Sequence, residues 1–304
     1  MKHIHFIAAL VLPLLACSCA DEEVVNQIVT VKLTPTLEIS QTESANVMKA
    51  MAENSPATIY AVQIYDGSKP IYYGLFNEPD SMKIALSTNT DYSMKIAAYQ
   101  TGTGSGLRYK NINGELFYYL PQEVKLENKF VADTLFNRIN HISTDILTDD
   151  STHEYPEVDA FYTEKEFQVF PDMSNVIFDL KRVGFAIDLN VKGLKSGKVI
   201  FYFDHDEIVL NPDNSNYYSI RSFTGEPEGI GSVAFNDTYF EQLPVTVKWF
   251  GTNGMVISCT SDLKFLRNCE VPVSVNLNTV NSKITLEDWY TESDTIDISK
   301  SIPQ

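Results

Sequence analysis

Alternation of apolar and polar residues along most of the chain predicts β-strands almost throughout. Residues 82–86, 92–98 and 271–277 repeat with a period of two, which places one set of side chains on a buried sheet face and the other towards solvent. Helix is expected only at residues 43–53 and 128–140. The same alternation predicts further strands at residues 27–34, 58–65, 70–76, 167–170, 198–203, 245–250 and 255–259.

The alternation changes phase at Lys181 and Arg182. Apolar residues take the even positions from 176 to 180 and the odd positions from 183 to 191. An unbroken strand cannot bury both sets on one face, so a β-bulge or a change of sheet is predicted at this point. Glycine-containing turns are predicted at residues 193–197 and 251–254.

The apolar run at residues 6–15 ends at a cysteine and is followed by acidic residues 21–23. A short apolar run after a basic start is the layout of a secretory signal, and a membrane span would need about 20 apolar residues. The cysteine indicates a bacterial lipoprotein signal over residues 1–16 and a mature chain that begins at lipidated Cys17, with palmitate as one acyl group. Cleavage elsewhere and lipidation of Cys19 are the alternatives. The acidic stretch resembles the surface-export signal of Bacteroidota lipoproteins, which implies an outer-membrane protein that faces outward.

Length and composition allow two domains or one large β domain. Hydrophobic residues make up 44% of the chain and aromatic residues 12%, which is ample material for a core. The formal net charge of −17 argues against binding nucleic acid or anionic lipid, so membrane attachment must come from the lipid anchor. We divide the chain into a signal peptide 1–16, a lipidated linker 17–26, an N-terminal β-sandwich domain 27–205, a C-terminal β domain 206–291 and a polar tail 292–304.

The chain has four cysteines, and two of them, Cys17 and Cys19, lie in the signal region. An exported protein can join the other two, Cys259 and Cys269, in a disulfide. A tight hairpin within residues 255–267 would instead place Cys259 opposite about residue 264. Both states of this pair stay open.

No catalytic residue, metal site or cofactor is predicted. The glycine-rich loop at residues 102–106 lacks the helix and the Lys-Ser/Thr pair of a phosphate-binding loop. The histidines outside the signal have no zinc-ligand spacing. Residues 204–207 are interpreted as a strand-end turn, and the acidic residues within 149–159 as a solvated loop, with calcium binding as the alternative. A hydrolase has the least support, because no nucleophile can be identified.

Neighbouring aromatic residues point to opposite faces of a strand, so one of each pair is expected to be exposed. Core or interface positions are favoured for these rings. A glycan platform at Trp249 or Trp289 is the competing interpretation. A short Asp-Ser/Thr motif resembles the O-glycosylation acceptor of Bacteroidota export proteins, and it occurs at Ser81, Thr134, Ser151 and Thr295.

Three segments behind the lipoprotein signal resemble the fimbrillin-like surface lipoproteins of the Bacteroidota, including minor pilus anchor and tip subunits. They are the strand pair at residues 59–76, the segment 178–187, and Leu266-Arg267-Asn268 before the strand at 271–277. The resemblance covers about a third of the chain. The family pattern of Arg, two residues and Ala-Lys-Ile is matched only in part, by Arg182 and Ala186.

The resemblance implies two tandem antiparallel β-sandwich domains of transthyretin-like type and a structural, non-enzymatic role. Family subunits assemble by donating a strand to a neighbour's sheet. Stalk subunits are cleaved at an arginine, and no matching site lies near Cys17, so the chain resembles an anchor or accessory subunit acting in adhesion. Its partners would be other pilus subunits or surface proteins, reached through exposed β edges. The expected contacts are the strand at 271–277, where Pro272 favours an edge, and the tail from Glu292. The alternative function is a glycan-binding lipoprotein of a polysaccharide-uptake system.

Overall fold

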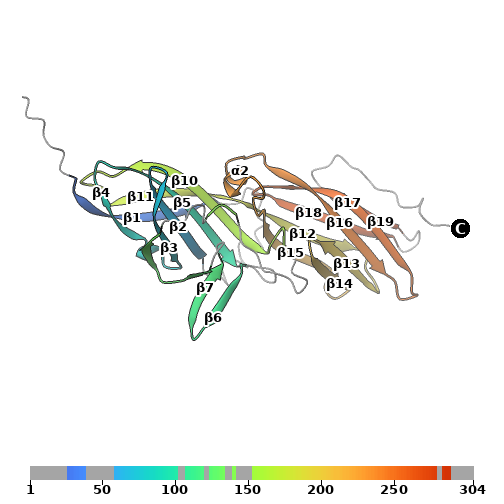
Figure 1. Cartoon of the computed structure of the whole chain (residues 1–304). Coiled ribbons are helices and arrows are strands. Elements are labelled where there is room, and N and C mark those ends of the chain that lie inside the picture. Colours follow the sequence, from blue (N-terminus) through green and yellow to red (C-terminus); the bar gives the residue numbers. More distant parts are fainter. Residues whose placement is uncertain are drawn as a thin grey trace, which may run out of the picture.

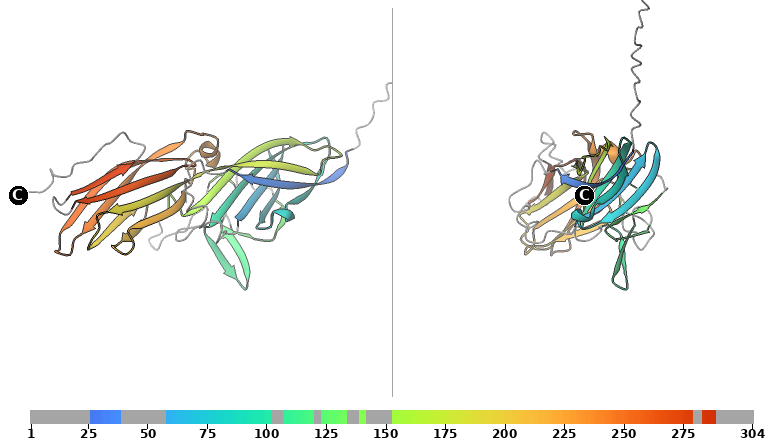
Figure 2. Two further views of the ribbon diagram at one scale, coloured as in Figure 1. Left: turned by 180° about the vertical axis from the view of Figure 1, so that it is seen from behind. Right: turned by 90° about the vertical axis from the view of Figure 1, so that its left-hand side faces the viewer.

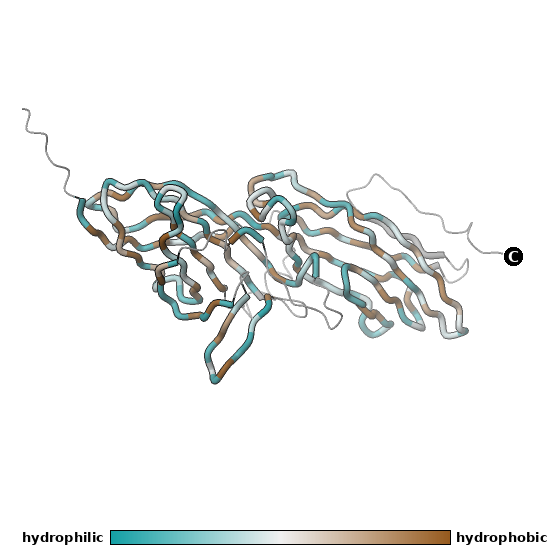
Figure 3. The backbone as a smooth tube through the Cα atoms, in the orientation of Figure 1, coloured by the Kyte–Doolittle hydropathy of each residue, from teal (hydrophilic) through white to brown (hydrophobic). Residues whose placement is uncertain are grey.

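The computed structural model describes residues 26–38, 58–101, 107–119, 123–133, 139–141, 153–278 and 283–288 (Figure 1). Its strands form two β-sandwich domains that lie end to end in an elongated molecule (Figure 2). Apolar and polar residues alternate along the strands (Figure 3), as the period of two predicts. The predicted all-β class with two tandem sandwiches is therefore confirmed.

The first domain is one eight-stranded sheet in the order β4-β1-β11-β10-β5-β2-β3-β9. The register between β10 and β11 covers only Phe161↔Arg182 and Tyr162↔Lys181, and the sheet folds over at this contact into two leaves. Residues from both leaves, such as Leu33 in one and Met94 in the other, share a core. The strands are β1 (Ile28–Leu37), β2 (Thr58–Asp66), β3 (Lys69–Phe76), β4 (Lys83–Ser87), β5 (Asp91–Thr101), β9 (Lys129–Ala132), β10 (Val158–Gln168) and β11 (Asn175–Arg182).

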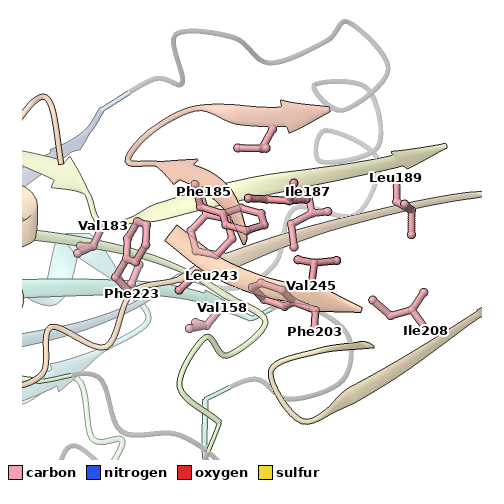
Figure 4. Packing of buried hydrophobic residues seen from close by; sticks show 14 of the residues in the cluster. Val158, Val183, Phe185, Ile187, Leu189, Phe203, Ile208, Phe223, Leu243 and Val245 are labelled. Carbon is pink, nitrogen blue, oxygen red and sulfur yellow. The ribbon is translucent and has the colours of Figure 1, made fainter. Parts of the chain in front are cut away.

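The second domain packs the sheet β15-β12-β18-β19 against the sheet β14-β13-β16-β17. Alternate residues of both sheets fill the space between them, with Phe185, Phe203 and Val245 near its centre (Figure 4). The strands are β12 (Gly184–Lys192), β13 (Lys198–Phe203), β14 (Asp206–Leu210), β15 (Asn216–Ser222), β16 (Phe240–Phe250), β17 (Val256–Leu266), β18 (Glu270–Asn278) and β19 (Lys283–Asp288).

Three smaller elements complete the described fold. The short helix α2 (Ile230–Ala234) lies where the domains meet, and a 3₁₀ turn, η1 (Pro79–Ser81), precedes β4. A three-stranded sheet of β6 (Tyr109–Ile112), β7 (Glu115–Tyr119) and β8 (Glu123–Lys125) projects from the first domain (Figure 1).

The phase change at Lys181 and Arg182 marks a change of sheet, as predicted. Strand β11 ends in the first domain at Arg182, and β12 begins in the second at Gly184. The chain therefore passes from the first domain to the second at Val183. The expected boundary near residue 205 is wrong, because β12 and β13 share sheets with the strands that follow them.

Some local expectations are also wrong. Residues 129–132 form strand β9, because β3 supplies a ladder of partners that outweighs helix propensity. Residues 256–266 form one strand, since Cys259, Leu263 and Phe265 keep a single phase towards the core, and the tight hairpin does not form. Of the two states left open for Cys259 and Cys269, the structure shows the one without a disulfide. The sandwiches are not purely antiparallel, because β1–β11 and β12–β18 are parallel pairs. The helix predicted at 43–53 lies outside the described residues.

The turns predicted at residues 193–197 and 251–254 are confirmed, since they join β12 to β13 and β16 to β17. Strand β18, by contrast, is not an edge, because β12 pairs with one side of it and β19 with the other. The Ala186 N–H donates to Cys269 O, so odd-numbered residues of β18 bond to β12 and Pro272 faces the β19 side. The described pairs between β18 and β19 end at Val273. Pro272 therefore lies just before that ladder, and its missing N–H removes none of the described hydrogen bonds.

Candidate functional site

The segment that enters β10 is shared by both domains. The ring of Tyr155 packs among aromatic rings of the second domain, 5.7 Å from Phe203 and 6.2 Å from Phe223 between centroids. The Ser222 N–H donates to Pro156 O at 3.1 Å. From Val158 onward the same segment runs into the first domain and pairs with β5. A single chain segment therefore belongs to both hydrophobic cores.

A buried ion pair lies where β10 meets β11. The Arg182 guanidinium donates from Nε and Nη2 to the two oxygens of Asp159, each at 2.7 Å. Both side chains are only 4% exposed. A two-bond contact between a guanidinium and a carboxylate is the geometry that best offsets the cost of removing two charges from water.

Arg267 of the second domain reaches into the first. Its Nη1 donates to Glu38 Oε2 and to the carbonyl oxygen of Arg182, both at 2.8 Å, and its Nη2 donates to Asp237 Oδ1 at 2.6 Å. Glu38, which directly follows β1, also accepts from the Arg182 backbone N–H at 2.8 Å. Arg267 is 3% exposed, so each of these acceptors is needed to satisfy a buried cation. We call Arg182, Asp159, Arg267, Glu38 and Asp237 the junction network.

A second buried arginine, Arg221, organises the carboxylates around it. Its Nη2 donates to Asp206 Oδ2 at 2.6 Å and to Glu157 Oε1 at 3.2 Å. Burial alone would lower the pKa of Arg221, but Tyr217 and Asp206 outweigh it and raise that pKa. Burial and the hydrogen bond to Glu157 raise the pKa of Tyr217. Two carboxylates compensate the buried charge of Arg221, while its Nε has no hydrogen-bond partner among the described residues.

These contacts correct the solvated-loop interpretation of residues 149–159. Glu157 and Asp159 are buried and pair with arginines. The strand-end turn predicted at residues 204–207 is confirmed, since Asp204 and His205 join β13 to β14 and Asp204 accepts from the Tyr155 N–H at 3.1 Å. Among the described residues, no group of three or more His, Cys, Asp or Glu side chains could hold a metal ion.

The predicted site residues are dispersed. Trp249 lies in the core of the second domain with 4% exposure, so its ring cannot serve as a glycan platform, and the core interpretation fits it. Ser81 is half-buried in η1, and its hydroxyl donates to Glu78 Oε2 at 3.2 Å. The other predicted residues lie outside the described part of the chain, namely Cys17, Thr134, Ser151, Trp289 and Thr295.

The structure also corrects one of the two predicted assembly contacts. Strand β18 is paired on both sides, so the 271–277 segment offers no free edge. Strand β19 ends its sheet, and its outer side carries no partner among the described strands. The tail from Glu292 follows β19 closely in sequence. The part of the chain that the structure describes contains no helix with the length and apolar character that a membrane span requires.

No family model and no curated protein matches the chain. Solved structures of similar fold include proteins of Bacteroidota species that are titled "putative adhesin", "tip fimbrial protein", "fimbrial assembly protein" and "putative polysaccharide binding proteins". A "putative adhesin" from Bacteroides ovatus is 10% identical, with 92% of this chain and 97% of that chain covered and a TM-score of 0.43. The tip fimbrial protein Mfa3 from Porphyromonas gingivalis, with a C-terminal truncation, is 6% identical, with coverage of 87% and 98% and a TM-score of 0.37. A fimbrial assembly protein from Parabacteroides distasonis is 10% identical, with coverage of 86% and 99% and a TM-score of 0.36.

We predict that Arg267→Ala lowers the free energy of unfolding by about 3 kcal/mol, because Glu38 and the Arg182 carbonyl lose a buried donor, whereas Asp237 is 70% exposed and contributes little. Denaturant unfolding followed by tryptophan fluorescence measures this loss. Lys32→Ala is the matched control, since it removes the exposed Lys32–Asp80 pair and should cost under about 1 kcal/mol. Equal losses in the two variants would contradict a special role for the junction network.

Alkaline pH should destabilise the fold through Tyr155. Burial, together with the hydrogen bond that Tyr155 donates to Glu241 Oε2 at 2.7 Å, raises the pKa of Tyr155 above the ordinary value of a tyrosine. A raised folded pKa adds stability that is fully present below about pH 10 and is lost as the pH rises further. Unfolding free energies measured from pH 8 to 11 should therefore fall less steeply in Tyr155→Phe. The exposed Tyr109→Phe serves as the control, and an unchanged slope in Tyr155→Phe would refute the assignment.

Proposed function

We propose that this chain is a non-enzymatic, surface-exposed outer-membrane lipoprotein that acts in adhesion as an accessory or anchor subunit of a pilus. It would meet its partners through β-strands added at a sheet edge. The tandem sandwiches and the junction network support this proposal, because they make one extended body from two domains. The buried carboxylates Asp159 and Glu157 are held by arginines, which favours a structural role for them over a catalytic one.

The position of β1 is the observation that carries the proposal. This strand lies between β4 and β11 and is parallel to β11, a neighbour far along the chain. Its alternate side chains Val31 and Leu33 are fully buried in the first core. Such a position offers backbone partners on both sides and pockets for alternate side chains, which is what a strand from another subunit would need. Because β1 fills its own groove, the arrangement suits a subunit that ends or anchors a polymer.

The placement of the strands favours contact through the second domain. Strand β1 begins at the far end of the first domain, while β19 lies in the second (Figures 1 and 2). A lipid on Cys17 would hold the first domain near the membrane and leave the second domain further out. The edge strand β19 and the tail that follows it are then the natural contacts for a partner.

Deleting residues 292–304 should abolish co-assembly while both domains stay folded, because the tail would supply the strand that a partner receives. Pull-down of the lipidated protein from its own cell surface, with mass spectrometry of the bound proteins, measures this. An unfolding midpoint equal to that of the full chain is the control for folding. Unchanged recovery of fimbrial subunits would eliminate the tail as the contact. Recovery of transporters or glycan-degrading enzymes instead would favour the polysaccharide-uptake role.

Cys17→Ser should release the protein from the membrane fraction, because a serine cannot receive the thioether-linked lipid. Cys19→Ser is the matched control and should leave the protein membrane-bound. Cell fractionation and intact mass of the mature chain report the outcome. The same mass tests the proposed O-glycosylation at Ser81, Thr134, Ser151 and Thr295, since a mass equal to the lipidated polypeptide alone would refute it. A Cys17→Ser protein that stays in the membrane would refute the anchor.

A further inference from the structure

The small sheet β6-β7-β8 stands away from the acidic body of the molecule (Figures 1 and 2). A two-residue turn at Asn113 and Gly114 closes its hairpin, and both residues have positive φ, 55° and 88°. Asparagine followed by glycine is the pair that such a turn favours, because both can adopt this backbone conformation. The Gly114 N–H donates to Asn111 Oδ1 at 2.9 Å, which fixes the turn further. The projecting unit is therefore a defined structure.

One face of this sheet attaches it to the protein, and the opposite face carries exposed Ile112 and Glu123 beside half-buried Phe117 and Tyr119. Tyr118 is 6% exposed and belongs to the large hydrophobic core, with Leu116 and Val124 packed against that core. The register pairs Lys110 with Phe117, and Phe117 with Lys125, on the opposite face. We call this opposite face the aromatic–cation face; its residues are Arg108, Lys110, Ile112, Glu115, Phe117, Tyr119, Glu123 and Lys125.

Arg108 differs from the other arginines that the structure describes. Its guanidinium carbon lies 4.0 Å from the ring centroid of Tyr119, a stacked cation–π contact. Arg182, Arg221 and Arg267 are buried in ion pairs. No carboxylate of the described residues forms an ion pair with Arg108. The Tyr119 ring thus holds its guanidinium in position, and no carboxylate of the described residues occupies its N–H donors.

The neighbours of Arg108 hold the face in shape. Lys110 Nζ forms an ion pair with Glu123 and lies 5.8 Å from the Phe117 centroid and 5.7 Å from that of Tyr119. The hydrogen bond to Glu123 raises the pKa of Lys110. The Tyr119 hydroxyl donates to Glu123 Oε2 at 3.0 Å. These contacts fix the Tyr119 ring, which in turn positions the guanidinium, so the site needs little ordering when it binds a ligand.

We infer that the aromatic–cation face binds an acidic polysaccharide, with a uronic acid carboxylate on Arg108 and a sugar ring against Phe117. A guanidinium matches a carboxylate with two parallel hydrogen bonds, and an aromatic ring offers a flat apolar surface to the C–H side of a sugar. The formal charge of −17 makes the body of the chain repel polyanions, so a cation on a projecting sheet is the place where such a ligand can approach. An acidic peptide would use the charge but not the ring. This inference goes beyond the proposed assembly role and does not depend on it.

Titration calorimetry of the full mature chain with hyaluronan and polygalacturonate tests the site, with neutral dextran as the ligand control. The wild-type protein should bind the two uronate polymers and not dextran. Arg108→Gln should weaken binding by about tenfold or more, the scale of one lost charge-assisted bond. Phe117→Ala should also weaken binding, because the sugar ring loses its apolar surface. Arg108→Lys should also weaken it, because an ammonium lacks the planar fork.

Lys129→Gln is the matched control, since Lys129 is an exposed cation of the neighbouring strand β9 and pairs only with Glu127 among the described residues. This variant should bind as the wild type does. An unchanged unfolding midpoint in Arg108→Lys separates loss of the site from loss of the fold. The inference is overturned if the wild type binds neither uronate polymer, if Lys129→Gln weakens binding as much as Arg108→Gln, or if polyglutamate binds as tightly as the uronates.

Discussion

Two buried arginines at the domain junction constrain the rest of the structure. A guanidinium removed from water must be paired, because an unpaired buried charge costs several kcal/mol. Arg182 meets this need with Asp159, and Arg267 meets it with Glu38 and Asp237. The acceptors come from the end of β1, from β10 and from the segment before β16, so satisfying two cations fixes the relative position of elements from both domains. The ring of Tyr155 adds an apolar contact between the same domains, because it packs against Phe203 and Phe223.

The pattern of apolar residues predicts much of this fold. The period of two identifies most strands, and the odd step after Leu180 marks the place where the chain leaves one sheet for another. The same pattern also predicts that Trp249 is buried. Val245 and Val247 are core residues of β16, and Trp249 continues their phase. The neighbouring ring of Phe250 takes the opposite phase and is half-buried.

The remaining features depend on contacts between distant parts of the sequence. Glu38 and Arg267 are 229 residues apart, and no local pattern connects them. The phase change at Lys181 and Arg182 marks a change of sheet, but it does not tell whether the new sheet belongs to the same domain, so the boundary near residue 205 was not corrected by it. Pro272 indicated an edge by a sound local rule, yet the edge lies one strand further on because β19 pairs only beyond the proline. The contact between Arg108 and the Tyr119 ring depends on the pairing of β6 with β7, and no sequence motif connects these two residues.

The Glu38–Arg267 pair has a mechanical consequence. Strand β1 runs from the far end of the first domain to the junction and stops just before Glu38, while β18 starts just after Arg267 and runs outward through the second domain. The ion pair joins these two strands almost end to end. A force applied along the molecule would act parallel to β1 and β18. Their backbone hydrogen bonds would then be loaded in shear, all at once, and would not be broken one after another. The Glu38–Arg267 pair and the covalent link at Val183 between β11 and β12 then carry tension across the junction side by side.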